Sequence, residues 1–166
     1  LTSCATKVSS ITDDVDSHLE EQEGYLLIAV DTNFNLKELQ IDGTKFVKFT
    51  AEDLRRGENY ILVNLPAGDY SISRVKLNSS MRLQGFEDDI WDFSVKENMI
   101  SYVGHLEIET ISFWYWGYSV MNLANNSSIA FEYLDENYPS ILKNRKVQYQ
   151  GPGEDDFFNV IYSTDD

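Results

Sequence analysis

An aromatic run in the second half of the chain has the clearest potential to bind a ligand. Residues 113–118 read Phe-Trp-Tyr-Trp-Gly-Tyr, and the candidate binding residues are Trp114, Tyr115, Trp116 and Tyr118. Consecutive strand residues face opposite sides, so these rings cannot all enter one core. Exposed rings stack on sugars, which makes carbohydrate or peptidoglycan binding one hypothesis. We favour the alternative that they pack under a helix and on a neighbouring sheet, because aromatic side chains usually serve cores.

The other reactive side chains do not form a recognisable catalytic or metal-binding set. The two histidines, His18 and His105, have no nucleophile or second ligand at a telling spacing. We expect His105 to lie at the surface, beside Glu107 on the solvated face of a strand. The sequence contains no paired cysteines, no glycine-rich phosphate loop and no His-Glu metal helix. We therefore expect a protein that is not an enzyme and that uses no metal and no cofactor.

Cys4 is the only cysteine, so the domain has to fold without an intramolecular disulfide. It lies in a polar segment with no positioned base, which argues against a catalytic nucleophile.

The composition also limits which partners the protein can bind. With 28 acidic and 13 basic residues among 166, the formal charge is −15, which repels nucleic-acid phosphates and anionic lipid headgroups. We expect one soluble acidic domain that does not bind nucleic acid.

The residues around Cys4 resemble a bacterial lipobox. Leu1-Thr2-Ser3-Cys4-Ala5 places a branched apolar residue and two small ones before a cysteine, which in lipoproteins receives the lipid. A lipobox ends a signal peptide, and the chain starts at the motif as if such a signal had been removed. The resemblance implies a lipid anchor on Cys4 in the bacterial cell envelope. Ala5 in place of Asp after the cysteine implies the outer membrane, with the domain facing the periplasm.

Residues 1–23 join this motif to a segment rich in Ser, Thr, Asp and Glu. Few apolar side chains are present to offset the entropy of ordering, so we expect a flexible acidic tether from Ala5 to Glu23. Acidic runs of this kind are usually solvated and repel themselves, so we expect no metal there. A tether of this length reaches at most about 65 Å when fully extended.

The domain itself is expected over residues 24–150, organised around a turn. Asn59 to Val75 is β-rich on both sides of Pro66 and Gly68, with apolar side chains recurring at every second position. Pro66 presets its own φ for a turn, and Gly68 accepts a positive φ without a Cβ clash. We expect a hairpin with one face in the core.

Two further strands anchor the predicted sheets. Tyr25 to Val30 is apolar on both parities, which predicts a central strand covered on both faces. From Met99 onward every second residue is apolar as far as Ile108, and the residues between them are polar and expected to face solvent. After Ile108 the apolar residues fall on the other set of alternate positions, which predicts a β-bulge near Glu109 or Thr110.

One amphipathic helix is expected near residues 128–138. Asn and Ser residues supply an N-cap, Ala130 and Leu134 share a helical stripe, and Pro139 ends it. Residues 151–166 are expected to form an acidic C-terminal tail. The predicted fold class is mainly β, an antiparallel β-sandwich with one C-terminal amphipathic helix.

Together with the lipobox, several segments resemble uncharacterised bacterial lipoproteins with a prealbumin-like sandwich, related in architecture to carboxypeptidase regulatory-like domains. The segments are the turn from Leu65 to Ile72, the run Phe93-Ser94-Val95 and the strand from Ile100 to Ile108. The segment from Ala130 to Pro139 is similar to their C-terminal helix. These are turn and core positions, so the resemblance implies a prealbumin-like fold and carries over no active site.

Two hypotheses about function follow from these observations. In the first, the protein is a membrane-anchored envelope lipoprotein that acts as a non-enzymatic scaffold or protein-interaction module, with another envelope protein as its partner. In the second, it is a carbohydrate-binding module that uses residues 113–118. The exposure of Trp114 and Trp116 distinguishes the two, because a sugar platform has to be open to solvent.

Overall fold

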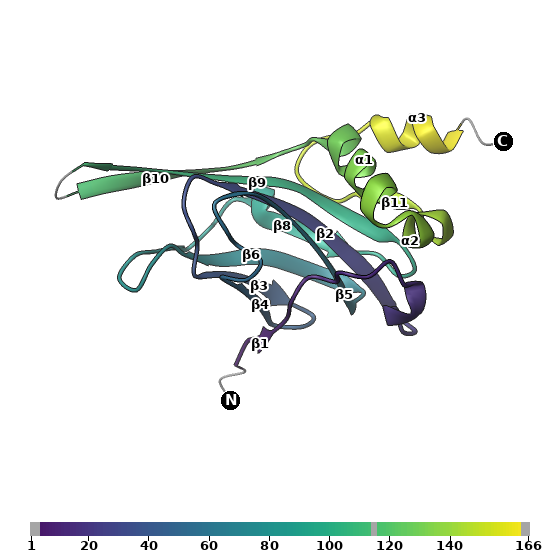
Figure 1. Cartoon of the computed structure of the whole chain (residues 1–166), viewed down its shortest axis with the longest axis horizontal. Coiled ribbons are helices and arrows are strands. Elements are labelled where there is room, and N and C mark those ends of the chain that lie inside the picture. Colours follow the sequence, from purple (N-terminus) through teal and green to yellow (C-terminus); the bar gives the residue numbers. More distant parts are fainter. Residues whose placement is uncertain (1–3, 114–115, 164–166) are drawn as a thin grey trace.

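The computed structural model describes residues 4–113 and 116–163, and this part of the chain is mainly β, as predicted. Two sheets pack face to face and form the expected sandwich. Three α-helices of the described part cover the outer face of one sheet (Figure 1). The molecule therefore has three layers: sheet A, sheet B and a helical layer.

Sheet A has the strand order β1-β4-β3-β6-β7, and β8 also pairs with β6. Its strands are β1 (Thr6–Lys7), β3 (Glu38–Gly43), β4 (Val47–Thr50), β6 (Gly68–Lys76), β7 (Arg82–Gln84) and β8 (Asp92–Val95). Sheet B has the order β10-β9-β2-β5, and β11 also pairs with β9. Its strands are β2 (Glu23–Thr32), β5 (Gly57–Pro66), β9 (Ile100–Phe113), β10 (Trp116–Ala124) and β11 (Val147–Tyr149).

The helical layer consists of α1 (Ser127–Asn137), α2 (Pro139–Asn144) and α3 (Phe157–Ser163). The helix predicted near residues 128–138 is α1. Pro139 ends it as expected, and the same proline begins α2, because proline is well suited to the first turn of a helix. Part of the predicted acidic tail also folds, since α3 buries Phe158 against sheet B. Two short 3₁₀ helices, Asp16–His18 and Asp89–Trp91, complete the described elements.

Strand β2 lies at the centre of the molecule, with both of its faces buried. It pairs antiparallel with β5 and parallel with β9. Leu26 and Ile28 point into the core between the sheets, whereas Tyr25 and Leu27 point into a second core under the helices. The central strand predicted from the sequence at residues 25–30 is confirmed, and its two apolar parities serve two different cores.

The turn at Pro66 joins two sheets, and the predicted hairpin is wrong. Strand β5 belongs to sheet B and β6 to sheet A. Ile61 and Ile72 enter the same core, but from its opposite sides. Gly68 has a φ of 149°, and a Cβ at this position would lie only 2.1 Å from the Thr44 hydroxyl oxygen. The turn requires glycine for both reasons. Alternation identifies the buried face of each strand and leaves its pairing partner undetermined.

The β-bulge in β9 lies at Val103 and not near Glu109 or Thr110, where the sequence pattern predicts it. Tyr102 and Gly104 pair with consecutive residues of β2, which leaves Val103 as the extra residue. Gly104 takes a φ of 130° at this position, a conformation that other residues rarely adopt.

The bulge reverses the side of sheet B toward which the apolar residues of β9 point. Before it, Ile100 and Tyr102 point toward the helices, and after it, Leu106 and Ile108 point into the core between the sheets. The residues that alternate with Leu106 and Ile108, beginning with His105, therefore lie on the helical side of sheet B. This shift determines which polar side chains are covered and which stay open.

Residues 5–23, which we name the N-terminal strap, run along the sandwich and contact both sheets. The composition predicts a flexible tether here, and that prediction is wrong. Strand β1 pairs in parallel with β4 of sheet A. Farther along, the Ile11 amide donates to the Leu62 carbonyl at 2.8 Å, and the Leu62 amide donates to the Ser10 hydroxyl at 3.0 Å. The strap thus lies along β5, at one edge of sheet B.

Acidic side chains fasten the strap to the helical layer. The Asp14 carboxylate accepts the amides of Ser140 and Ile141 at the start of α2, at 2.7 and 2.9 Å. Burial acts to raise the pKa of the Asp14 carboxyl, but the hydrogen bonds from Ile141 and Ser140 outweigh it, and the pKa lies below its usual value. Asp16 pairs with Arg145 at 3.0 Å. These carboxylates are used to satisfy a helix N-terminus and a cation.

Truncation of a core residue should be costly. Ile72 and Leu106 are both 0% exposed in the core between the sheets, so replacing either by alanine should lower the free energy of unfolding by about 2 to 5 kcal/mol. Urea denaturation measures the change. Ile129→Ala, at an exposed site on α1, should cost less than about 0.5 kcal/mol. Equal losses in all three variants would contradict the assignment of the core.

The strap should contribute measurably to stability through Asp14. Asp14→Ala removes the acceptor for the first amides of α2 and should cost about 1 kcal/mol, as loss of a helix cap does. The same denaturation assay measures it, with exposed Asp135→Ala as the matched control. A strap that behaves as a free tether would show no difference between the two variants.

Candidate functional site

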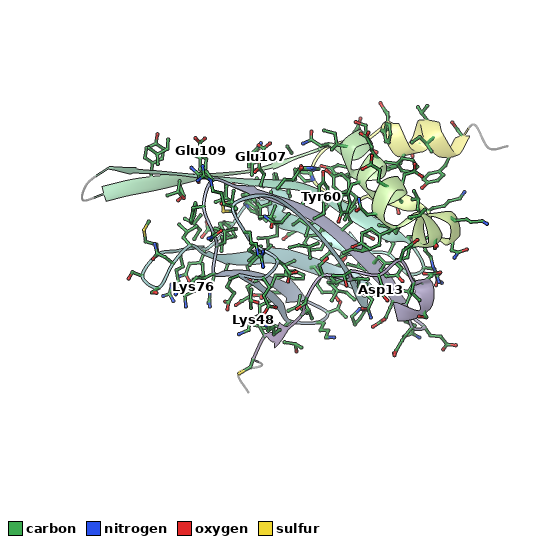
Figure 2. All side chains as sticks on the ribbon, in the orientation of Figure 1. Asp13, Lys48, Tyr60, Lys76, Glu107 and Glu109 are labelled. Atoms are coloured by element: carbon green, nitrogen blue, oxygen red, sulfur yellow. The ribbon has the colours of Figure 1, made fainter. Side chains whose placement is uncertain are left out.

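The helices cover only part of the outer face of sheet B, and the rest is open. The covered part ends near His105 of β9, where α1 starts. Beyond it, Glu107 and Glu109 are exposed and project away from the body of the molecule, on the side opposite Lys48 and Lys76 (Figure 2). Two features meet at this boundary: a buried polar network around His105 and an open acidic surface.

His105 is buried, with 3% of its surface exposed, so the predicted surface position is wrong. Its Nδ1 lies 2.6 Å from the Tyr102 hydroxyl, and its Nε2 lies 3.1 Å from both the Tyr60 hydroxyl and Glu58 Oε1. The Tyr102 oxygen already accepts the Asn126 amide, so its own proton is available for Nδ1. This pattern assigns the neutral tautomer with the proton on Nε2.

Burial lowers the pKa of His105 because desolvation disfavours the charged imidazole, although the neighbouring Glu58 carboxylate acts in the opposite direction. Burial also raises the pKa of the Tyr60 and Tyr102 phenols. Tyr133 of α1 stacks on Tyr60 with 3.8 Å between ring centroids and closes the network from the helical side. Both ring nitrogens of His105 are hydrogen-bonded within the chain, and the network joins α1 to sheet B.

Next to this network, four carboxylates gather on the open part of sheet B; we name Asp31, Glu58, Glu107 and Glu109 the acidic face. Asp31 of β2 lies directly opposite Glu58 of β5 on one side and Glu107 of β9 on the other. Residues directly opposite each other project from the same face about 5 Å apart, where like charges are destabilising. Within the described residues, no Lys or Arg forms an ion pair with these carboxylates. Glu58 and Glu107 are hydrogen-bonded by neutral side chains, so the negative charge of this surface is not neutralised by a cation of the described residues.

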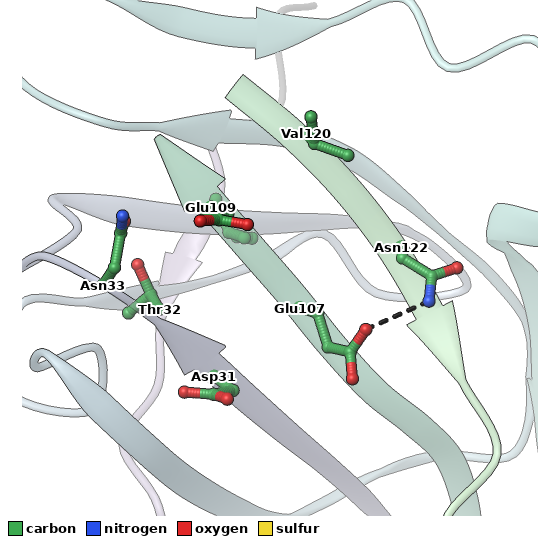
Figure 3. Close-up of a pocket in the computed structure, with 8 residues that line it drawn as sticks. Asp31, Thr32, Asn33, Glu107, Glu109, Val120 and Asn122 are labelled. Atoms are coloured by element: carbon green, nitrogen blue, oxygen red, sulfur yellow. Dashed lines mark hydrogen bonds between the residues drawn. The ribbon is translucent and has the colours of Figure 1, made fainter. Parts of the chain in front are cut away.

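A shallow depression of about 340 Å³ is lined by three carboxylates of the acidic face, Asp31, Glu107 and Glu109 (Figure 3). It is lined by β2, the residues after it, β9 and β10, with Glu107 accepting the Asn122 amide at 3.0 Å. Asn33 bonds through its side chain to both backbone groups of Thr110, at 2.9 and 3.0 Å, and so extends the pairing along β9. Among the residues that the structure describes, no three His, Cys, Asp or Glu side chains are arranged to hold a metal ion.

The structure describes only part of the aromatic stretch at residues 113–118. Trp114 and Tyr115 lie outside the described residues, and Trp116 begins β10, paired with Phe113. Tyr118 is 51% exposed on the same face as Val120, which is 53% exposed. Among the predicted binding residues, Tyr118 has a described side chain, and this side chain lies beside the acidic face.

The acidic face could not be identified from the sequence. Asp31 and Glu107 meet only because β2 and β9 pair in parallel, and nothing local to either strand indicates that pairing.

Cys4, the predicted lipidation site, is a free and exposed thiol just before β1. None of the described helices is long and apolar enough to cross a membrane.

No family model matches this chain, and no curated protein matches it either.

The stability of the protein should fall as the pH drops below about 6.5, the ordinary pKa of histidine. The folded pKa of His105 is depressed, so the unfolded chain takes up a proton first. The stabilisation is complete above the unfolded pKa and is lost as the pH falls toward the folded one. Urea denaturation between pH 7.5 and 5.5 measures this slope. His105→Gln should flatten it, and Glu58→Gln should steepen it; parallel slopes in all three proteins would contradict the assignment.

Proposed function

We propose that this protein is a lipid-anchored lipoprotein of the bacterial cell envelope that acts as a non-enzymatic protein-interaction module. The observation that carries the interaction role is the β9–β10 hairpin. Strand β2 accompanies β9 only as far as Ile108, and beyond Thr110 the two strands of the hairpin pair with each other alone. Figure 1 shows the hairpin extending to the left, past the body of the sandwich.

The polar groups near the hairpin support contact with a partner more than they support catalysis. Beneath the helical layer, His105 bonds to groups of its own chain through both nitrogens. Outside, Tyr118 and Val120 offer apolar surface beside the carboxylates of Glu107 and Glu109. Exposed apolar surface rimmed by polar groups is typical of interaction sites.

The anchor is supported by the lipobox-like residues that end at Cys4 and by the exposure of its thiol. Each buried methylene contributes about 0.8 kcal/mol, so the two or three acyl chains of a bacterial lipoprotein hold it almost irreversibly. Attachment then needs no apolar patch on the domain, and covalent lipid outweighs the repulsion between a charge of −15 and an anionic surface. We assign the protein to the outer membrane, facing the periplasm.

The alternative of a carbohydrate-binding module has one supporting observation, the exposure of Tyr118 on the same hairpin. A tyrosine ring open to solvent can stack on a sugar. Titration with peptidoglycan fragments, followed by tryptophan fluorescence, distinguishes this function from protein binding.

Changing Cys4 to serine in the full-length precursor, signal peptide included, should move the protein from the membrane fraction to the soluble fraction. Its melting temperature should not change, because the thiol is exposed. Fractionation followed by immunoblotting measures the distribution, and Ser9→Ala serves as a nearby control that should stay with the membrane. A serine variant that still sediments with membranes would refute lipid anchoring at this residue.

A further inference from the structure

We propose that the free edge of β10 binds an extended, basic segment of a partner protein, which joins sheet B as an additional strand. This inference rests on the interaction role proposed above and specifies the chemistry of the partner. It follows from three properties of the molecule: the edge is unpaired, it is unprotected, and it lies beside the acidic face.

The two edges of sheet B differ in how they are covered. At the β5 edge, the strap lies alongside and exchanges hydrogen bonds with Leu62. At the β10 edge, no strand or backbone group of the described residues pairs with the side that faces away from β9. An edge of this kind presents a row of amide and carbonyl groups ready for another strand.

Strand β10 also lacks the features by which proteins blunt such an edge. Natural edges are kept short, bulged, or marked with charged residues and proline. The nine residues of β10, from Trp116 to Ala124, contain no charge and no proline, although 25% of the chain is charged. Its register with β9 runs without a shift over the whole length. The edge is therefore long, regular and uncharged, which are the properties that strand addition requires.

The acidic face indicates the charge of the incoming strand. Glu107 and Glu109 lie one strand inside β10, directly opposite Asn122 and Val120. A strand added at the edge would run about 4.8 Å beyond β10, so lysine or arginine side chains on its outer face can extend over β10 toward these carboxylates. Their apolar stems would rest on Tyr118 and Val120, which are about half exposed.

The same charges argue against a second copy of the chain as the occupant. Pairing β10 with its own copy would bring together two molecules of charge −15, each with its own acidic face. Like-charge juxtaposition disfavours such a complex, whereas an opposite charge steers a partner toward the surface. The occupant that fits is therefore a basic strand from another protein.

The test uses the mature chain and a labelled nine-residue peptide of alternating lysine and valine, with binding followed by fluorescence anisotropy. We expect saturable binding that weakens with added salt. Replacing the lysines by glutamate, or methylating alternate backbone nitrogens, should weaken binding at least about tenfold. Equal binding of the methylated peptide would overturn strand addition, because it would show attraction between charges without use of the edge.

Variants of the protein locate the site. Val120→Lys places a charge on the edge, and the double variant Glu107→Gln with Glu109→Gln removes the acidic partners; each should weaken binding about tenfold. Ile129→Lys, at an exposed site on α1, is the matched control and should bind as the unmodified chain does. Melting temperatures confirm that each variant is folded. Unchanged affinity in both the Val120→Lys variant and the double glutamate variant would overturn the proposal.

Two further outcomes separate this inference from the interaction role. A dimer of the mature chain that Val120→Lys dissociates, detected by analytical ultracentrifugation, would overturn the proposal in favour of a second copy. A photo-crosslinker at Tyr118 in intact cells tests the hairpin independently of any peptide. If the peptide does not bind but the crosslinker captures a protein, strand addition is wrong and the interaction role survives; if both fail, neither stands.

Discussion

Burial of both faces of β2 is the constraint on which the rest of the structure depends. The residues from Tyr25 to Val30 are each 0% exposed, so this strand needs an apolar layer on either side. Sheet A supplies one layer, and α1, α2 and α3 supply the other. Sheet B without its helices would leave Tyr25 and Leu27 in water. The helical layer is therefore part of the fold itself.

The extra residue Val103 links this architecture to the candidate site. Because of the bulge, β9 gives Tyr102 to the helical side and Leu106 to the core between the sheets. The same shift puts His105 under the stacked rings of β5 and α1, where its nitrogens are all bonded internally. It also turns Glu107 outward, past the reach of the helices. The buried network and the acidic face are two results of one irregularity in a strand.

The fold class could be predicted because short stretches of sequence indicate strands and turns, through alternation of apolar residues and through turn residues such as Gly68. Short stretches of sequence do not indicate which strands pair with each other. Alternation identifies Ile61 and Ile72 as buried, yet the two strands belong to different sheets. The strap shows the same limit, since Asp14 finds its partners 126 and 127 residues away, where no local pattern reaches. The acidic face likewise depends on the parallel register of β2 and β9, which composition and spacing do not reveal.

The docked strap changes the mechanics of the proposed anchor. Only Ala5 separates Cys4 from β1, which is bonded to β4, so the domain has almost no slack between it and the lipid. A pull at Cys4 would load β1 along its own axis, with the backbone bonds to β4 resisting in shear. Farther along the strap, the same tension would pass to β5 and to the start of α2. The strap is placed to act as a tie that bears force before the core of the sandwich does.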